Sequence, residues 1–153
     1  MPAPFRVRRL READLDRIME IEHASFGRDA YDRNLFAEFL RQSGELCLVA
    51  ERGREIWGYI ISCTRGSRAE VASIAVDPPA RRKGAASALM DSTLRRLRRR
   101  GIQRVGLMVR LRNRQARAFY ARYGFEAVRI VRKYYSGRCD GLYMAKELAS
   151  FRT

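Results

Sequence analysis

The chain has 153 residues and a formal net charge of +15, from 32 lysines and arginines against 17 aspartates and glutamates. This length suits one domain with a sizeable core, which we expect to span residues 1–153. A composition of 46% hydrophobic and 32% charged residues is that of a globular protein and argues against a disordered chain. The N-terminus lacks the apolar segment of a secretory signal and no apolar run is long enough to cross a membrane. The sequence therefore predicts a cytoplasmic protein without membrane association.

The positive charge is spread along the chain rather than confined to one tail. It favours anionic partners such as phosphates, nucleic acid, acidic peptides or a ribosome surface. Arginines that merely cover solvated faces explain the charge equally well, and the even spread weakens nucleic-acid binding as the primary function. The three cysteines, Cys47, Cys63 and Cys139, form no Cys-x-x-Cys pair. We therefore expect neither a disulfide framework nor a metal site.

The hydrophobic periodicity predicts the secondary structure in chain order. The first half contains a strand at Phe5–Arg9, helices at Arg11–Glu22 and Tyr31–Arg41, and strands at Leu46–Glu51 and Ile56–Thr64 that form a hairpin around Gly53. The second half contains a strand at Glu70–Val76, a helix at Arg82–Arg100, a strand at Arg104–Val109, a helix at Asn113–Tyr123, and strands at Phe125–Tyr135 and Gly141–Leu148. This order predicts an α+β fold with a mixed sheet.

The densest signal for a ligand follows the strand that ends at Ile74–Val76. The segment Arg81–Ser87 leads into a helix, and unpaired N–H groups at a helix N-terminus bind anions. Glycine and alanine in this segment let the backbone approach a pyrophosphate closely, and Arg81, Arg82 and Lys83 add positive charge. The segment thus predicts a phosphate-bearing ligand, although a basic helix start alone gives a similar pattern. Neither Gly-x-x-x-x-Gly-Lys-Ser/Thr nor Gly-x-Gly-x-x-Gly occurs.

A second motif lies one helix and one strand further on, Asn113-x-x-Ala116-x-x-Phe119-Tyr120-x-x-x-Gly124-Phe125. Together with Arg81-x-x-Gly84-x-Ala86, it makes the chain resemble the GNAT superfamily of acetyltransferases, from about Phe5 to Leu148. The resemblance implies a single GNAT-type domain. Its mixed central sheet would have about seven strands, splayed between the strands at 70–76 and 104–109, with four flanking helices.

The same resemblance implies that the chain binds acetyl-coenzyme A as its acyl donor. The pantetheine arm would lie along the strand that ends at Val76, and the pyrophosphate would lie on the N–H groups of Arg82–Ser87. The residues implied to bind the cofactor are Ile74, Ala75, Val76, Arg81, Arg82, Lys83, Gly84, Ala85, Ala86, Ser87, Asn113 and Tyr120. Tyr120 is implied as the proton donor to the departing thiolate, whereas its helical spacing with Ala116 and Phe119 fits a core aromatic.

The C-terminal part is similar to the RimI-type ribosomal-protein-alanine N-acetyltransferases, through Arg132-Lys133-Tyr134-Tyr135 and Asp140-Gly141-Leu142-Tyr143-Met144. The similarity implies an enzyme that acetylates a protein N-terminal amine. Where that group has a glutamate as general base, this chain has Met108, and a thioether cannot accept a proton. Glu70 is the first candidate for the base, and Glu22 and Tyr134 are the alternatives. An α-amine acceptor, with a pKa of about 7.7–8.0, also needs less help than a lysine.

Two other functions stay open from the sequence. A non-catalytic acyl-coenzyme-A-binding module would explain Met108, and the enzyme could instead acetylate a small-molecule amine. His23, at the end of the first predicted helix, is explained by the helix dipole without a catalytic role. The sequence leaves the acceptor and the oligomeric state undetermined.

Overall fold

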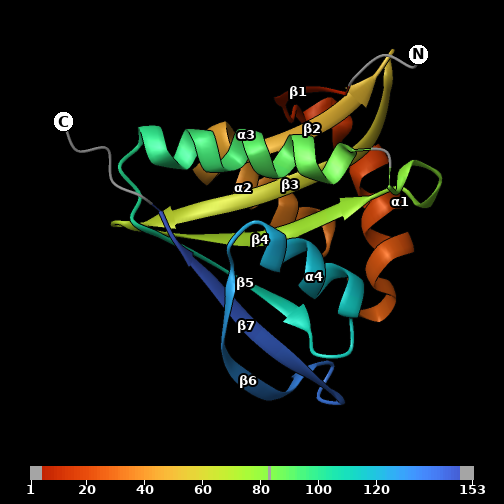
Figure 1. Cartoon of the computed structure of the whole chain (residues 1–153). Helices are drawn as coiled ribbons and strands as arrows, with labels where there is room; N and C mark the ends of the chain where they lie inside the picture. Colours follow the sequence, from red (N-terminus) through yellow and green to blue (C-terminus); the bar gives the residue numbers. More distant parts are fainter. Residues whose placement is uncertain (1–4, 83, 149–153) are drawn as a thin grey trace.

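The computed structural model describes residues 5–82 and 84–148. Its strands and helices are, in chain order, β1 (Arg6–Arg9), α1 (Leu15–Phe26), α2 (Arg33–Ser43), β2 (Cys47–Arg52), β3 (Glu55–Arg65), β4 (Arg68–Val76), α3 (Ala85–Arg99), β5 (Arg104–Arg110), α4 (Arg114–Arg122), β6 (Glu126–Tyr135) and β7 (Cys139–Glu147). The strands form one seven-stranded mixed sheet in the order β1-β2-β3-β4-β5-β7-β6 (Figure 1). The predicted α+β fold is confirmed.

The predicted elements are all present, and every helix begins later than the periodicity suggested, α1 and α3 by three residues or more. α1 starts at Leu15 because Glu12–Asp14 first forms a tight 3-10 turn, in which Asp14 accepts a hydrogen bond from the N–H of Arg11 at 2.7 Å. α3 starts at Ala85 rather than Arg82, because Gly84 adopts a left-handed backbone with φ 95° that cannot continue a right-handed helix.

Helices cover the sheet on both faces. α3 and α4 lie on one face, and α1 and α2 lie on the other (Figure 1). Alternate residues of β2 serve the two resulting cores: Leu48 and Ala50 pack toward α3, whereas Cys47 and Val49 pack among residues of α1 and α2. This burial on both faces explains why β2 reads as a continuous apolar run rather than an alternating one.

β4 and β5 are parallel neighbours that separate partway along their length. Their pairing ends where Val71 lies opposite Leu107, whereas β4 continues to Val76 and β5 to Arg110. The register of β4 against β3 shifts at the same place, around Ala72. The two arrowheads diverge in Figure 1, so the predicted splay between these strands is confirmed.

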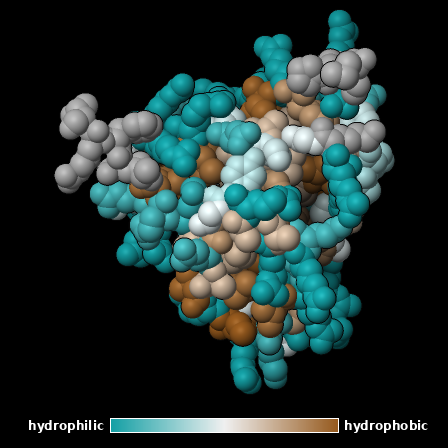
Figure 2. Space-filling view, in the orientation of Figure 1, coloured by the Kyte–Doolittle hydropathy of each residue, from teal (hydrophilic) through white to brown (hydrophobic). Residues whose placement is uncertain are grey.

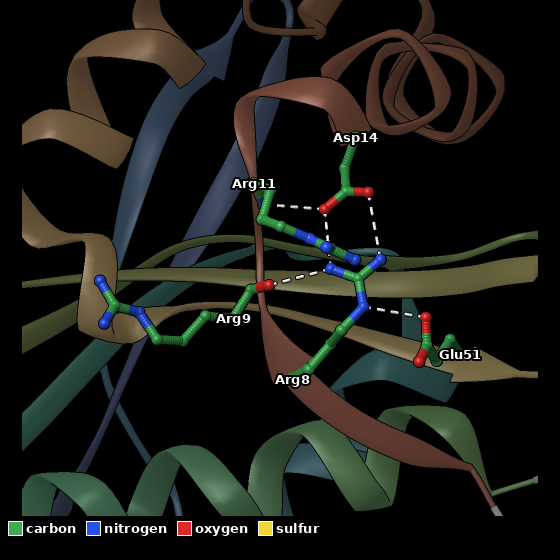
Figure 3. A network of polar contacts seen from close by, with 5 residues as sticks. All are labelled: Arg8, Arg9, Arg11, Asp14 and Glu51. Atoms are coloured by element: carbon green, nitrogen blue, oxygen red, sulfur yellow. Dashed lines mark hydrogen bonds and ion pairs between the residues drawn. The ribbon is translucent and has the colours of Figure 1, made fainter. Parts of the chain in front are cut away.

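A network around Arg8 fixes the N-terminal strand to the rest of the fold (Figure 3). Its guanidinium group donates to both carboxylate oxygens of Asp14, at 2.9 and 3.1 Å, and to Glu51 on β2 at 2.8 Å. Burial alone would raise the pKa of the Asp14 carboxyl group, but the hydrogen bonds from Arg8 and from the N–H of Arg11 lower it below its usual value. The network therefore stabilises the ionised form of Asp14.

Hydrophilic side chains dominate the visible surface over α3, and a hydrophobic patch lies over β6 (Figure 2). Val128 and Ile130 supply exposed apolar side chains on this edge strand. Within residues 5–82 and 84–148, no helix has the length and apolar character needed to cross a membrane.

Candidate active site

Two cavities open where β4 and β5 separate. The larger, of about 900 Å³, lies between the end of β4, the loop before α3, and α4. The smaller, of about 380 Å³, lies between α1, β4, β5 and the β6–β7 hairpin. The residues that line both cavities are Ser25, Phe26, Ile74, Asn113, Ala116 and Tyr120. The two cavities therefore meet, and a group bound in one can reach a group bound in the other.

The larger cavity has the features of a site for a phosphate-bearing ligand. Its loop passes through left-handed backbone at Arg82 and Gly84 before α3 begins. The first N–H groups of α3 have no partner within the helix, and the helix dipole favours an anion there. Arg81 and Arg82 are exposed beside it, and Arg81 also donates from Nε to the carbonyl oxygen of Val76 at 3.2 Å. Lys83, which the sequence places in the same loop, lies outside the described residues.

The structure brings the other predicted cofactor-binding residues together. Those lining the larger cavity are Ile74, Ala75, Val76, Arg81, Arg82, Gly84, Ala85, Ala86, Ser87, Asn113 and Tyr120. The edge of β4 that faces this cavity has no strand partner beyond Val71. Its N–H and C=O groups are therefore free to hydrogen-bond an extended ligand in the manner of an added strand.

Asn113 has a structural role that explains its place in the second motif. Its side-chain oxygen caps α4 by accepting a hydrogen bond from the N–H of Ala116 at 3.1 Å. The side-chain NH2 group is not needed for this cap, so it is free to donate to a ligand in either cavity. Asn113 is thus both a helix cap and a cavity residue.

Tyr120 lies on α4 where the two cavities meet, with 8% of its surface exposed. Its ring packs edge-on against Phe119 and Phe125, with centroids 5.6 and 5.9 Å away. This packing is that of a core aromatic, while the position beside both cavities is the one that the proton-donor prediction requires. Burial raises the pKa of its hydroxyl group, so the phenol is protonated at neutral pH and has a proton to give.

Glu22 is a buried carboxylate in the wall of the smaller cavity, with 1% of its surface exposed. One oxygen accepts hydrogen bonds from the hydroxyl groups of Tyr59 on β3 and Ser73 on β4, the latter at 2.9 Å. The other oxygen accepts from the N–H of Tyr31 at 2.9 Å. Burial, followed by the Glu22 charge, raises the pKa of the Tyr59 hydroxyl group, so this tyrosine stays protonated.

Glu70, Met108 and Tyr134 also line the smaller cavity. Glu70 is exposed, and it accepts a hydrogen bond from the hydroxyl group of Tyr143 at 2.9 Å. It lies opposite Gly106, in the part of β4 that is still paired with β5. Met108 follows two residues later on β5, so its side chain is on the same face of the sheet as Glu70. The predicted base candidates thus line the same cavity as Met108.

A second group of residues bounds the smaller cavity beside the β6–β7 hairpin. Asp29, which follows α1, forms an ion pair with Arg110 at the end of β5 and a hydrogen bond with Ser136 in the β6–β7 turn. The guanidinium group of Arg110 also lies over the ring of Tyr135, 4.6 Å from its centroid. These contacts tie the segment after α1 to the β6–β7 hairpin.

Ser25, Ser73, Asp29 and Arg110 line the cavities but were not among the residues predicted for the site. The sequence did contain a signal for the hydrogen-bond partners of Glu22. This residue continues the apolar stripe of α1, and a carboxylate on a buried stripe needs hydrogen-bond partners. No local pattern marks the others, since Asp29 and Arg110 are 81 residues apart in the chain. Among the residues that the structure describes, no group of three or more His, Cys, Asp or Glu side chains is arranged to hold a metal ion.

Comparisons with known proteins point to one family. The model of the acetyltransferase (GNAT) family matches residues 13–125. An N-alpha-acetyltransferase of Sulfurisphaera tokodaii is 29% identical over 157 residues, which cover 94% of this chain and 93% of that protein. The crystal structure of Ard1 from Thermoplasma volcanium superposes with a TM-score of 0.92 at 27% identity, over 97% of this chain and all of the other. The ribosomal-protein-S18-alanine N-acetyltransferase of Escherichia coli gives a TM-score of 0.84 at 27% identity, over 97% and 96% of the two chains.

Proposed function

Because the chain belongs to the acetyltransferase (GNAT) family, we propose that it transfers the acetyl group of acetyl-coenzyme A to the α-amine of a protein N-terminus. The observation that carries the proposal is the junction of the two cavities at Ile74 and Tyr120. A donor in the larger cavity and an acceptor in the smaller cavity meet there. The N-alpha-acetyltransferase and the S18-alanine N-acetyltransferase that resemble this chain over nearly its whole length support this acceptor class.

We assign the donor site to the larger cavity. The pyrophosphate of acetyl-coenzyme A binds at Arg81–Ser87, where positive charge, small residues and the α3 N-terminus coincide. The arm lies along the free edge of β4 between Ile74 and Val76, and Asn113 donates to it. Lys83 belongs to this proposed site through its sequence position alone.

Direct attack then needs an acid for the leaving group. The neutral amine attacks the thioester carbonyl carbon, and N–H groups on the free edge of β4 stabilise the oxyanion. As the carbon–sulfur bond breaks, Tyr120 gives its phenolic proton to the thiolate. Tyr120 suits this role because it is protonated at neutral pH and lies where donor and acceptor meet.

The shape of the smaller cavity supports an N-terminal amine over a bulky acceptor. Its volume is about 380 Å³, which leaves room for the first part of an extended peptide. The ion pair between Asp29 and Arg110 and the hydrogen bond between Ser136 and Asp29 bound the cavity beside the β6–β7 hairpin. A small-molecule amine would also fit, so the acceptor class is decided by experiment.

The test is release of coenzyme A in the presence of an acceptor panel. The panel contains peptides with free N-termini, the same peptides with blocked N-termini and an internal lysine, and small amines. The proposal expects release that depends on the free N-terminus. Tight acetyl-coenzyme-A binding with no release on any acceptor would instead support a non-catalytic binding module, for which Met108 is the motivating observation.

A specific surface favours an additional association with an anionic partner such as a ribosome, in the cytoplasm. The β3–β4 turn lies beside the α3–β5 turn, because the N–H of Gln103 donates to the carbonyl oxygen of Ser67 at 2.7 Å. This brings the exposed Arg65, Arg68 and Arg99 to the end of the sheet opposite the splay. We propose that these arginines bind phosphate groups of RNA.

The test compares salt-dependent RNA binding of two double variants. R65Q/R68Q is expected to weaken binding and reduce its salt dependence. R6Q/R54Q removes the same charge from exposed positions on β1 and the β2–β3 turn and is expected to bind like the parent. Equal weakening by both would show that only net charge matters.

A further inference from the structure

The substitution of Met108 leaves open which group removes the proton from the acceptor, and Glu22 stands out among the carboxylates of the smaller cavity. A carboxylate has about four acceptor positions, and the Glu22 oxygens use three for Tyr59, Ser73 and Tyr31. The free position is on the oxygen that accepts from the N–H of Tyr31. Glu22 therefore still has capacity to accept a hydrogen bond from a ligand.

Glu22 is also placed close to the junction of the cavities. Its partner Ser73 directly precedes Ile74, which lines both cavities. Ser25 lies one turn after Glu22 on α1 and lines both cavities as well. Its hydroxyl oxygen is buried and has no hydrogen-bond partner among the residues described. An unpaired buried hydroxyl group costs stability unless a ligand or water satisfies it. The Ser25 hydroxyl group can therefore hydrogen-bond a polar group of a ligand at the junction.

Glu70 lacks these features. It lies three residues before Ser73 on β4, a distance of roughly 10 Å along a strand. It is exposed and held by Tyr143. It therefore borders the cavity on the side away from Ile74 and Tyr120.

The smaller cavity is acidic although the protein carries a charge of +15. The charged residues in its lining are Glu22, Asp29, Glu70 and Arg110. Arg110 is ion-paired with Asp29, so Glu22 and Glu70 remain uncompensated by the lining. Such a cavity attracts a protonated amine, which is the main form of an N-terminus at neutral pH.

We infer that Glu22 binds the acceptor ammonium group and takes its proton, replacing the base that is lost at the Met108 position. The inference rests on the proposed function. One ammonium proton passes to the Glu22 carboxylate, and the amine lone pair forms the bond to the thioester carbon. The carbon–sulfur bond then breaks, and Tyr120 protonates the thiolate. A second proton leaves the nitrogen as the amide forms and restores the Tyr120 phenol. The first proton leaves Glu22 for solvent, which completes the balance.

The two tyrosines that face Glu22 stay protonated in the working pH range. The groups that face Glu22 are Tyr59 on β3 and Tyr31 before α2, and burial raises the pKa of both hydroxyl groups. Around the rest of the cavity lie Glu70, Tyr120, Tyr134, Tyr135 and the Asp29–Arg110 pair. Burial also raises the pKa of Tyr120 and Tyr135.

The test is the pH dependence of kcat/KM for an N-terminal peptide in E22Q, compared with E70Q at the other uncompensated carboxylate of the cavity. A glutamine at 22 keeps the hydrogen bonds, because its oxygen accepts from the Tyr31 N–H and its NH2 group donates to the two hydroxyl oxygens. Without the base, only the neutral amine reacts, and its fraction rises roughly twentyfold between pH 6.5 and 8.5 for a pKa near 8. We expect kcat/KM of E22Q to rise by about that factor, whereas the parent and E70Q stay within about threefold.

E22D, which keeps a carboxylate, is expected to restore the flat profile at a lower rate, and it serves if E22Q does not fold. A uniform loss in E22Q at every pH would overturn the inference in favour of a packing role, and a steep profile in E70Q would transfer the role to Glu70. Peptide binding to the coenzyme-A complex gives a readout without turnover. The parent should prefer the free N-terminus over the acetylated one, and E22Q should lose this preference. If the parent binds the free N-terminus but never acetylates it, the proposed function fails, whereas the binding of the ammonium group by Glu22 is still supported.

Discussion

The hydroxyl group of Tyr143 reaches across β5 to Glu70 on β4, where it donates a hydrogen bond of 2.9 Å. The path is open only because the residue beneath it is Gly106, where an added Cβ would overlap the Tyr143 hydroxyl group. Glu70 is therefore fixed by a neighbour two strands away. The hydrogen bond links β4 to β7 across β5, and this structural role explains the presence of Glu70 without a catalytic one.

G106A should therefore displace Tyr143 and release Glu70. The ring must swing away from Arg129, which stacks on it at 4.7 Å, so we expect a stability loss of about 1–2 kcal/mol in urea denaturation. Y143F removes only the hydroxyl group and should lose less than about 1 kcal/mol. Activity of Y143F should stay within about twofold of the parent, and a large loss would mean that Glu70 acts in catalysis after all.

The backbone at Gly84 gives a prediction about donor binding. Gly84 has φ 95° and open space where a Cβ would be, so G84A strains the loop by about 1 kcal/mol without a steric clash. Because this loop precedes the proposed pyrophosphate site, we expect coenzyme-A affinity to fall about fivefold, measured by calorimetry. Gly53 in the β2–β3 turn is a matched control, with φ 66° and equally open space. G53A should lose similar stability and bind coenzyme A like the parent.

The residues of the proposed donor site could be selected from the sequence because they are close together in the chain. Arg81, Gly84 and Ala86 lie within six residues of one another in the loop and the first turn of α3, and Asn113 caps the helix that holds Tyr120. The acceptor side was harder, because its contacts join distant segments. Glu22 and Ser73 are 51 residues apart, and no periodicity in either segment reveals the other. Glu70 could be selected only by its place on a strand, whereas burial and partners distinguish Glu22.

The Arg8 network predicts how stability depends on pH. The folded-state pKa of Asp14 is lowered, so its ionisation stabilises the fold above the unfolded value of about 3.9. That contribution is lost as pH falls below this value toward the folded pKa. D14N should therefore cost about 2 kcal/mol at pH 7, and the difference from the parent should shrink below about pH 4. D16N removes a carboxylate that is 89% exposed and should change stability by less than about 0.5 kcal/mol.

Removing the Tyr120 hydroxyl group tests the proposed acid. Y120F keeps the ring contacts with Phe119 and Phe125 and deletes only the group that would protonate the thiolate. We expect kcat to fall by about 10²–10³, with coenzyme-A affinity and the unfolding midpoint nearly unchanged. Y123F is a suitable control from the same helix region, because the Tyr123 hydroxyl group bonds to Ser87 and Asp91 outside the junction. A kcat within threefold of the parent in Y120F would assign the proton transfer to another group or to water.

A carboxylate at Met108, on the other side of the splay, tests whether another base can replace Glu22. Met108 lines the smaller cavity, and glutamate has a similar length, so M108E places a base where the RimI-type pattern has one. In the parent background Glu22 already removes the proton, and we expect M108E to change kcat/KM by less than threefold. In the E22Q background the same substitution should raise kcat/KM at pH 6.5 at least tenfold and flatten the pH profile. Equal rate gains in both backgrounds would instead mean that the native site lacks a base and that Glu22 has only a packing role.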